Sequence, residues 1–366
     1  MLIKTDFFSE ASIQPPTIMQ PLLNSYGLGN INLVKTENLS GNTILNLTLV
    51  TGSLTNSQQV ASFYGSLGGS IIVVSHTEMH VKIQGNVAEF SKLFNTTFSN
   101  YKCNSTSTIT NQTCFSSNSI AYIPKSLETA IIGIIGLEEV LKLKPNYVMT
   151  QKKPISPSSV YNGPNVAQIY GFPASPGANI RVGIVSLGGF FLQSDLQSFF
   201  TLFGLGNAPK ISIVLLDGAQ LDFGDINSSY ENYLDVEIIA SVVPQANITF
   251  FFAPNTWQGF YDVIATALQR SDVVSLSWGT SEIYVSSYWS VFNTLLAQYS
   301  QVPIFIATGD YGSDVGVGFP ASCLNAIGMA YLKLLMIIDN YYPYNFILIW
   351  CKTQNKKKPG SFKEIN

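Results

Sequence analysis

The chain has 366 residues, of which 46% are hydrophobic and 11% are charged, and its formal net charge is -3. This length and apolar content suffice for two ordinary domains with buried cores, and they exclude a disordered chain. The small negative charge excludes an electrostatic attraction to nucleic acid, so no nucleic-acid partner is expected.

The first patterned region predicts a compact α+β unit. Strands are expected at 43–50, 71–74 and 79–84, helices at 57–68 and 87–94, and an extended segment at 120–124, with residues 134–143 closing the unit. Strands that alternate with two helices over about 130 residues are typical of an α+β plait that folds on its own.

The second patterned region predicts an α/β domain. Residues 144–163 are rich in Lys, Pro, Ser and Asn without periodicity, which indicates a linker and, in a zymogen, the processing region. Beyond it, strands expected at 181–186, 210–216, 247–252, 273–277 and 303–307 alternate with helices expected at 195–203, 230–243, 259–268 and 285–299. Apolar strands alternating with amphipathic helices predict a parallel sheet covered on both faces, with its site at the carboxyl ends of the strands.

Several local features favour an extracellular location. Seven N-x-[ST] sequons begin at Asn38, Asn46, Asn95, Asn104, Asn111, Asn227 and Asn247. Cys103 and Cys114 bracket a polar loop and are candidates for a disulfide, which needs an oxidising compartment, although unpaired cysteines are the alternative. No signal peptide is visible at the start of the chain. Charged residues and a proline interrupt the apolar stretch 331–350, so a membrane anchor is not expected.

The histidines exclude two common kinds of site. Only His76 and His80 are present, and both precede the linker. The α/β domain therefore has no imidazole base for a Ser-His-Asp triad. A zinc site of His and Cys ligands is not expected either, so no metal is predicted in this chain.

Carboxylates remain as the candidate catalytic groups. Glu231 and Asp235 are four residues apart on an expected helix, so they share one face. Such a pair is usually a solvated helix surface, but two neighbouring carboxylates in a partly buried place cannot both ionise easily, and one then holds a proton at acidic pH. Asp310 lies between glycines just after an expected strand, which is a candidate site position or an ordinary turn.

A series of short motifs resembles the sedolisin family of serine-carboxyl peptidases, which includes the kumamolisins. The motifs occur in family order: IVSLGG at 184–189, LDGA at 216–219, ENYLD at 231–235, FFFAPN at 250–255, SLSWG at 275–279, ATGDYGS at 307–313 and FPAS at 319–322. Residues 43–137 resemble the pro-kumamolisin activation domain. The resemblance implies an activation domain at 30–143, a linker at 144–163, the first part of a subtilisin-like peptidase domain at 164–322, and a divergent tail at 323–366.

The resemblance also implies roles for individual residues. Glu231 is expected to be the general base, Asp235 the carboxylate that orients it, and Asp310 the protonated acid that donates to the oxyanion. A carboxylate base and a neutral acid donor work together only at acidic pH. Ser277, Trp278 and Gly279 are expected to bind an extended polypeptide substrate by strand addition. The expected partners are thus polypeptide substrates and the protein's own propeptide.

The chain also departs from the family pattern. The family's nucleophile lies in a Gly-Thr-Ser-Ala-x-x-Pro motif and its calcium site lies further on, and neither occurs in these residues. Ser186 stands where kumamolisins carry a supporting Glu. We therefore expect a secreted acid endopeptidase lineage in the form of an inactive, truncated precursor, with calcium bound only by the missing part. The alternatives are a peptide-binding or inhibitory pseudoprotease and, more weakly, a membrane-tethered surface protein.

Overall fold

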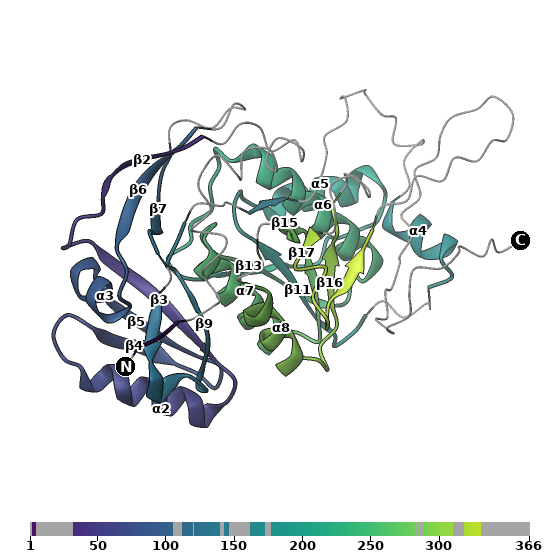
Figure 1. Cartoon of the computed structure of the whole chain (residues 1–366). Coiled ribbons are helices and arrows are strands. Elements are labelled where there is room, and N and C mark those ends of the chain that lie inside the picture. The colour runs from purple at the N-terminus through teal and green to yellow at the C-terminus, as the bar shows by residue number, and fades with distance from the viewer. Residues whose placement is uncertain are drawn as a thin grey trace, which may run out of the picture.

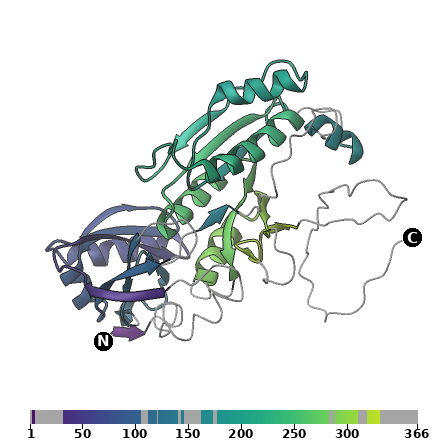
Figure 2. The same cartoon turned by 90° about the horizontal axis from the view of Figure 1, so that it is seen from above.

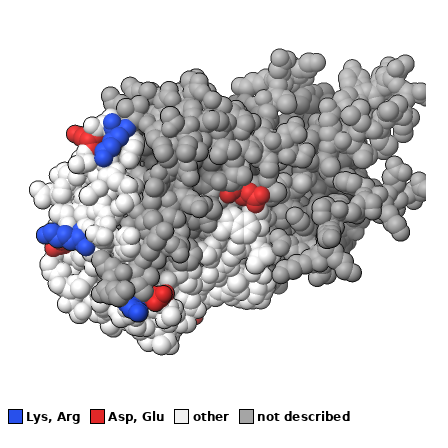
Figure 3. Space-filling view, viewed as in Figure 1, with Lys and Arg blue, Asp and Glu red and all other residues white. Residues whose placement is uncertain are grey.

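The computed structural model describes residues 2–4, 32–104, 112–119, 121–139, 143–145, 162–172, 177–282, 285, 288–309 and 318–330, with the backbone alone for 2–4, 32–34, 102–104 and 112–113. The described residues form an N-terminal unit (32–139) and a C-terminal unit (162–330), which lie side by side in Figure 1 and Figure 2. On the face drawn in Figure 3, charged side chains are sparse, and blue and red ones lie next to each other on the N-terminal unit.

The N-terminal unit is built on a four-stranded antiparallel sheet. The strand order is β4 (Ile72–His76), β5 (His80–Asn86), β3 (Ile44–Thr51) and β9 (Ile131–Ile135). Helix α2 (Leu54–Ser66) packs on β3, β4 and β5, and helix α3 (Val87–Leu93) packs on β5. The helices bury Val60, Tyr64 and Phe90 against the sheet. This is the α+β unit that the sequence predicts.

Helix α2 begins earlier than the apolar spacing predicts. The Ser53 side chain accepts a hydrogen bond from the backbone N–H of Asn56 at 3.2 Å and so caps the helix at Leu54. Capping by Ser satisfies one of the free N–H groups of the first turn. The predicted start at Ser57 was wrong because the cap, and not the first apolar residue, fixes where the helix begins.

A second antiparallel sheet in this unit has no counterpart in the sequence prediction. It consists of β2 (Asn32–Asn38), β6 (Phe98–Asn104) and β7 (Gln112–Ser117). Its strands are rich in Ser, Asn, Lys and Thr and lack a clear apolar alternation. Two short strands, β1 (Leu2–Lys4) and β8 (Tyr122–Pro124), pair with each other, and a single 3-10 turn follows at Lys125–Leu127.

The C-terminal unit is an α/β domain, as predicted. Its parallel sheet has the order β12 (Ser212–Leu215), β13 (Asn247–Phe252), β11 (Arg181–Ser186), β14 (Val273–Leu276), β16 (Ile304–Ala307) and β18 (Ile327–Met329). The helices are α4 (Gly163–Ile169), α5 (Gln193–Leu202), α6 (Ile226–Val242), α7 (Trp257–Arg270) and α8 (Trp289–Gln298). Two short strands, β15 (Trp278–Ser281) and β17 (Gly318–Phe319), pair antiparallel outside the main sheet.

Alternate residues of each central strand serve two different cores. On β13, Phe250 and Phe252 pack in a cluster with residues of α5 and α6, whereas Phe251 belongs to a cluster with residues of α7 and α8. The two faces of a strand alternate because successive side chains point in opposite directions. Both faces of the sheet are therefore covered by helices, and the predicted α/β class is confirmed.

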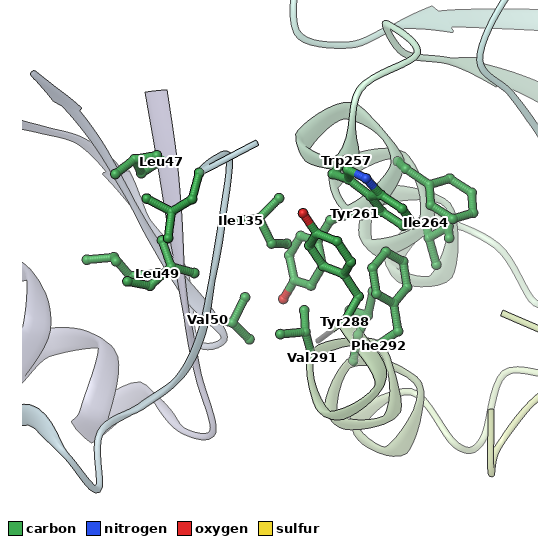
Figure 4. Close-up of a cluster of buried hydrophobic side chains, with 14 of the residues drawn as sticks. Leu47, Leu49, Val50, Ile135, Trp257, Tyr261, Ile264, Tyr288, Val291 and Phe292 are labelled. Carbon is green, nitrogen blue, oxygen red and sulfur yellow. The ribbon is translucent and has the colours of Figure 1, made fainter. Parts of the chain in front are cut away.

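One apolar core spans the boundary between the two units. Figure 4 shows side chains of β3 and β9 facing side chains from α7 and from the region of α8. Leu47, Leu49, Val50 and Ile135 belong to the same buried cluster as Trp257, Tyr261, Ile264, Tyr288, Val291 and Phe292. The sheet of the N-terminal unit thus has α2 and α3 on one face and the C-terminal unit on the other. Within the described part of the chain, no helix is long and apolar enough to cross a membrane.

Candidate active site

The turn after β11 fixes the helix that carries the predicted catalytic carboxylates. Gly189 has φ of +70°, and a Cβ atom there would lie 2.5 Å from the backbone nitrogen of Ser229 at the start of α6. Only glycine adopts this conformation readily and leaves room for such an approach. The glycine pair at 188–189 therefore lets the end of the central strand press against the first turn of α6.

Polar contacts then hold the same turn to the helix. Asn232 donates from Nδ2 to the backbone carbonyls of Gly188 (3.0 Å) and Phe190 (3.2 Å). The backbone N–H of Phe190 donates to Ser229 Oγ at 3.0 Å. Asp225 caps α6 by accepting from the backbone N–H of Ser228 at 3.1 Å. These hydrogen bonds fix the first two turns of α6, and with them the part of the helix that carries Glu231 and Asp235.

Glu231 and Asp235 lie on successive turns of α6, as the spacing predicts. Glu231 is buried, with 4% of its surface exposed. The carboxylate of Asp235 accepts a hydrogen bond from Ser277 Oγ at 2.8 Å. Burial raises the pKa of Asp235 well above its ordinary value, and the hydrogen bond from Ser277 offsets part of this rise. Glu231 is thus buried and Asp235 half-buried, so the two carboxylates do not form the solvated helix surface that a four-residue spacing usually indicates.

Ser277 comes directly after β14, at the carboxyl end of the parallel sheet, where the site of such a fold is expected. The sequence predicts that Ser277 and Gly279 bind a peptide through their backbones. The hydrogen bond from the Ser277 side chain to Asp235 was missed, since nothing in the sequence indicates which loop faces the helix.

Strand β15, which contains Trp278 and Gly279, has a peptide segment paired with it. Lys144 and Pro145 form β10, which runs antiparallel to β15 with Lys144 opposite Gly279 and Pro145 opposite Trp278. Residues 144–163 are predicted to be a linker, and the first two of them form this strand. The segment that joins the two units thus occupies the strand to which the sequence assigns substrate binding.

The structure describes only some of the remaining residues singled out from the sequence. Asp310 lies outside the described residues, as does the side chain of Cys103. Cys114 is disulfide-bonded, and Cys323 is a free, buried cysteine. The Ser186 hydroxyl donates to the carbonyl of Gly188 at 2.9 Å and accepts from its N–H at 3.3 Å, so this side chain closes the local turn.

A group of polar residues meets at the boundary between the units, and the sequence does not predict this contact. Lys82 of β5 lies 2.6 Å from Asp262 of α7 and 3.2 Å from Asp217, which follows β12. His80 packs edge-on against Tyr261 with ring centroids 5.6 Å apart. The contact was missed because Lys82 and His80 belong to one unit and Asp217, Tyr261 and Asp262 to the other, and no local pattern connects the two.

Metal binding finds no support in the part of the chain that the structure describes. No group of three or more His, Cys, Asp or Glu side chains there is arranged to hold an ion.

Comparisons with known proteins agree with the motifs. Residues 48–140 match the family model "Pro-kumamolisin, activation domain". The chain is 30% identical over 225 residues to kumamolisin from Bacillus sp. (strain MN-32), an alignment that covers 55% of this chain and 41% of kumamolisin. The chain thus spans less than half the length of this curated relative.

A comparison of structures gives a Pseudomonas sedolisin, described as a serine-carboxyl proteinase, in complex with two molecules of pseudo-iodotyrostatin. The TM-score is 0.41 at 19% sequence identity, over 48% of this chain and 55% of the sedolisin chain.

Proposed function

We propose that this chain, which belongs to the sedolisin family of serine-carboxyl peptidases and contains a pro-kumamolisin activation domain, represents the precursor of a secreted endopeptidase that cleaves polypeptides at acidic pH. The N-terminal unit is its propeptide. The observation that carries the proposal is the pairing of β10 with β15, next to the Ser277 that binds Asp235. A peptide strand meets the buried Glu231 and the partly buried Asp235 there, as an endopeptidase requires.

The proposed chemistry assigns one role to each carboxylate. Glu231 accepts the proton of the attacking hydroxyl, and Asp235 holds Glu231 in place. Asp310, in its protonated form, donates a hydrogen bond to the oxyanion that develops on the scissile carbonyl. A raised pKa at Asp235 supports this assignment, because a group that retains its proton near neutrality lets the neighbouring carboxylate serve as the base.

The polypeptide of 366 residues is itself proposed to be inactive. It contains no Gly-Thr-Ser-Ala motif, and Ser281, in its one Gly-Thr-Ser, lies on β15 opposite Gly318. Without a nucleophile, only binding and oxyanion stabilisation remain, which contribute a small part of the rate. The proposed function of this polypeptide does not involve a bound calcium ion.

The sequons and the disulfide-bonded Cys114 support the extracellular part of the proposal. A disulfide persists in an oxidising compartment and is rare in the cytosol.

Two experiments test the proposed function. The purified polypeptide is incubated with an unfolded protein substrate from pH 2 to 5, and no hydrolysis is expected; pepstatin-insensitive cleavage that rises with protein concentration would refute its inactivity. Next, the genomic DNA is sequenced past the codon for Ser322. If a reading frame there encodes Gly-Thr-Ser-Ala, the segment it encodes is fused after Ser322 to give a joined protein. The joined protein should hydrolyse the substrate at acidic pH, and Glu231→Gln should lower kcat by about a thousandfold or more. If no such motif follows, the peptide-binding alternative replaces the peptidase.

A further inference from the structure

The side chain of Asn255 binds the backbone of the connecting segment at one residue. Its Nδ2 donates to the carbonyl of Leu143 at 2.8 Å, and its Oδ1 accepts from the N–H of Leu143 at 3.1 Å. One carboxamide thus satisfies both backbone polar groups of a single residue. A neighbouring strand makes the same pair of bonds in an antiparallel sheet, so Asn255 takes the place of a strand at this point.

The next two residues are held by a real strand. Lys144 and Pro145 pair with Gly279 and Trp278 of β15. The connecting segment is therefore bound at three successive residues, first by Asn255 and then by β15. All these contacts except the side-chain amide are made by backbone, so they do not depend on the sequence of the bound peptide.

Of these three residues, Leu143 is the one whose side chain is buried. This side chain is 3% exposed and belongs to the apolar cluster that spans the two units, whereas Lys144 is exposed and Pro145 is half-buried. Full burial of a leucine side chain favours binding by a factor of about ten to a hundred over an exposed one. The position bound by Asn255 is therefore the one of the three where the surroundings discriminate between side chains.

Asn255 is held on rigid elements. It follows β13 at the carboxyl edge of the sheet, and the next residue, Thr256, caps α7 by accepting from the N–H of Gly259 at 2.9 Å. A carboxamide fixed between a strand and a capped helix loses little freedom when it binds a peptide.

We propose that Asn255 is a substrate-positioning residue, which binds the backbone of one substrate residue, and that the apolar surroundings of Leu143 select a large aliphatic side chain there. In the precursor the connecting segment fills this subsite; in the mature protein a polypeptide substrate does. Proline is excluded at the Leu143 position because it lacks the N–H, but is accepted two residues later, as Pro145 shows. This inference rests on the proposed function for its substrate.

The first test measures amide hydrogen exchange at Leu143 in the full chain. Asn255→Ala should accelerate this exchange about fivefold to tenfold, because this factor corresponds to the free energy of one neutral hydrogen bond. Asn255→Asp keeps the acceptor for the Leu143 N–H and should leave most of the protection. Asn207→Ala, at an exposed asparagine, is the matched control and should change nothing. Unchanged exchange in Asn255→Ala would overturn the proposal.

The second test asks whether a peptide in trans uses the same contacts. A full chain with Leu143→Asp disfavours its own segment, because a charge then faces the apolar subsite. The labelled peptide Ac-VLKLKPNYV, which has the sequence of residues 140–148, is titrated into it. Adding Asn255→Ala should weaken binding about tenfold. A peptide with N-methylleucine at its fourth position keeps only the carbonyl contact with Asn255, so adding Asn255→Ala should weaken its binding less than that of the normal peptide. A peptide with serine at this position should bind both chains at least tenfold more weakly.

The outcomes separate this inference from the proposed function. Equal loss of affinity for the N-methyl peptide and the normal peptide on adding Asn255→Ala would refute the subsite, whatever the chain hydrolyses. If the peptide results hold and the joined protein of the preceding section hydrolyses nothing, the subsite stands and the peptidase does not. Should Leu143→Asp prevent folding, hydrogen exchange in the Asn255 variants alone decides.

Discussion

The Lys82 ammonium nitrogen lies 2.6 Å from Oδ2 of Asp262, and this ion pair joins the N-terminal unit to the C-terminal unit. The side chains are 24% and 7% exposed, so the pair is largely shielded from water. Gln258 Nε2 donates to the same Asp262 oxygen at 2.5 Å, and Thr48 of β3 donates to Gln258 Oε1. A polar network therefore lies inside an otherwise apolar interface, where an unpaired charge is costly.

Lys82→Met should weaken the attachment of the N-terminal unit to the C-terminal unit. The substitution leaves the Asp262 carboxylate buried without its cation, so the free energy of unfolding should fall by about 2 kcal/mol at pH 7. Urea unfolding measures this value, and hydrogen exchange in α7 reports whether the loss is at the interface. Arg181→Met removes an ion pair with the exposed Asp272 within the C-terminal unit and should leave exchange in α7 unchanged. An equal effect of both variants would contradict the prediction.

His80 should weaken the interface on acidification. Burial against Tyr261 lowers its pKa to about 4, with Lys82 adding to this effect and Asp217 opposing it. The unfolded value is about 6.5, so the neutral form stabilises the interface above pH 6.5 and this contribution is lost as the pH falls from 6.5 to 4. The loss amounts to roughly 3 kcal/mol. His80→Gln should flatten the stability profile between pH 6.5 and 4, measured by urea unfolding; an unaltered slope would disprove it.

Ionisation of Glu138 should change the stability of the interface with pH in the direction opposite to that of His80. It is 5% exposed, and Tyr288 Oη donates to it at 3.3 Å across the interface. Burial raises its pKa to about 7, so the protonated form stabilises the docked state below pH 4.5 and this contribution is lost as the pH rises from 4.5 through 7. Glu138→Gln should therefore raise stability at pH 8 by roughly 2 to 3 kcal/mol and change little at pH 4. Equal effects at both pH values would show that its ionisation is not coupled to docking.

Gly133 of β9 sets how closely the N-terminal unit approaches α8. A Cβ atom at this position would lie 2.6 Å from Cγ2 of Val291, which is fully buried. Gly133→Val should cost about 1 to 3 kcal/mol by overpacking. Adding Val291→Ala should recover part of that loss in urea unfolding. Gly65→Ala, where the new Cβ would meet Val73 at an ordinary 3.8 Å, is the control; no recovery in the double variant would contradict the contact.

Ser277→Ala should raise the pKa of Asp235 further. The hydrogen bond from Ser277 stabilises the ionised carboxylate and offsets part of the effect of burial. Its loss should move the titration upward by about one pH unit, followed through the carboxyl carbon in NMR spectra. Ser241→Ala, whose hydroxyl bonds within α6, should not move it. A downward movement in Ser277→Ala would show that burial is not the dominant cause.

Local pattern predicts much of this structure. The bounds of β11 and β13 agree with the predicted strands at both ends, because buried parallel strands are short apolar runs closed by turns. The spacing of Glu231 and Asp235 predicts that both lie on one face of α6, and the structure has them on successive turns. These features depend on a few neighbouring residues, which the sequence displays directly.

What the sequence did not reveal depends on contacts between distant segments. Asn255 and Leu143 are 112 positions apart, and Lys82 and Asp262 are 180 positions apart, so no local periodicity connects them. The sheet of β2, β6 and β7 was missed because its strands are polar and pair with one another without a strong apolar alternation. The role of Asp310 stays a prediction, since it lies outside the described residues.

Because β3, β9, α7 and α8 share one apolar core, cleavage of the connecting segment and separation of the two units are distinct events. Cutting the chain between residues 145 and 162 breaks one covalent connection, but it removes no side chain from that core. The two pieces would remain together as a noncovalent complex, held by buried leucine, valine and aromatic side chains. Release of the N-terminal unit would then follow the dissociation rate of the cut complex and lag behind the cleavage itself.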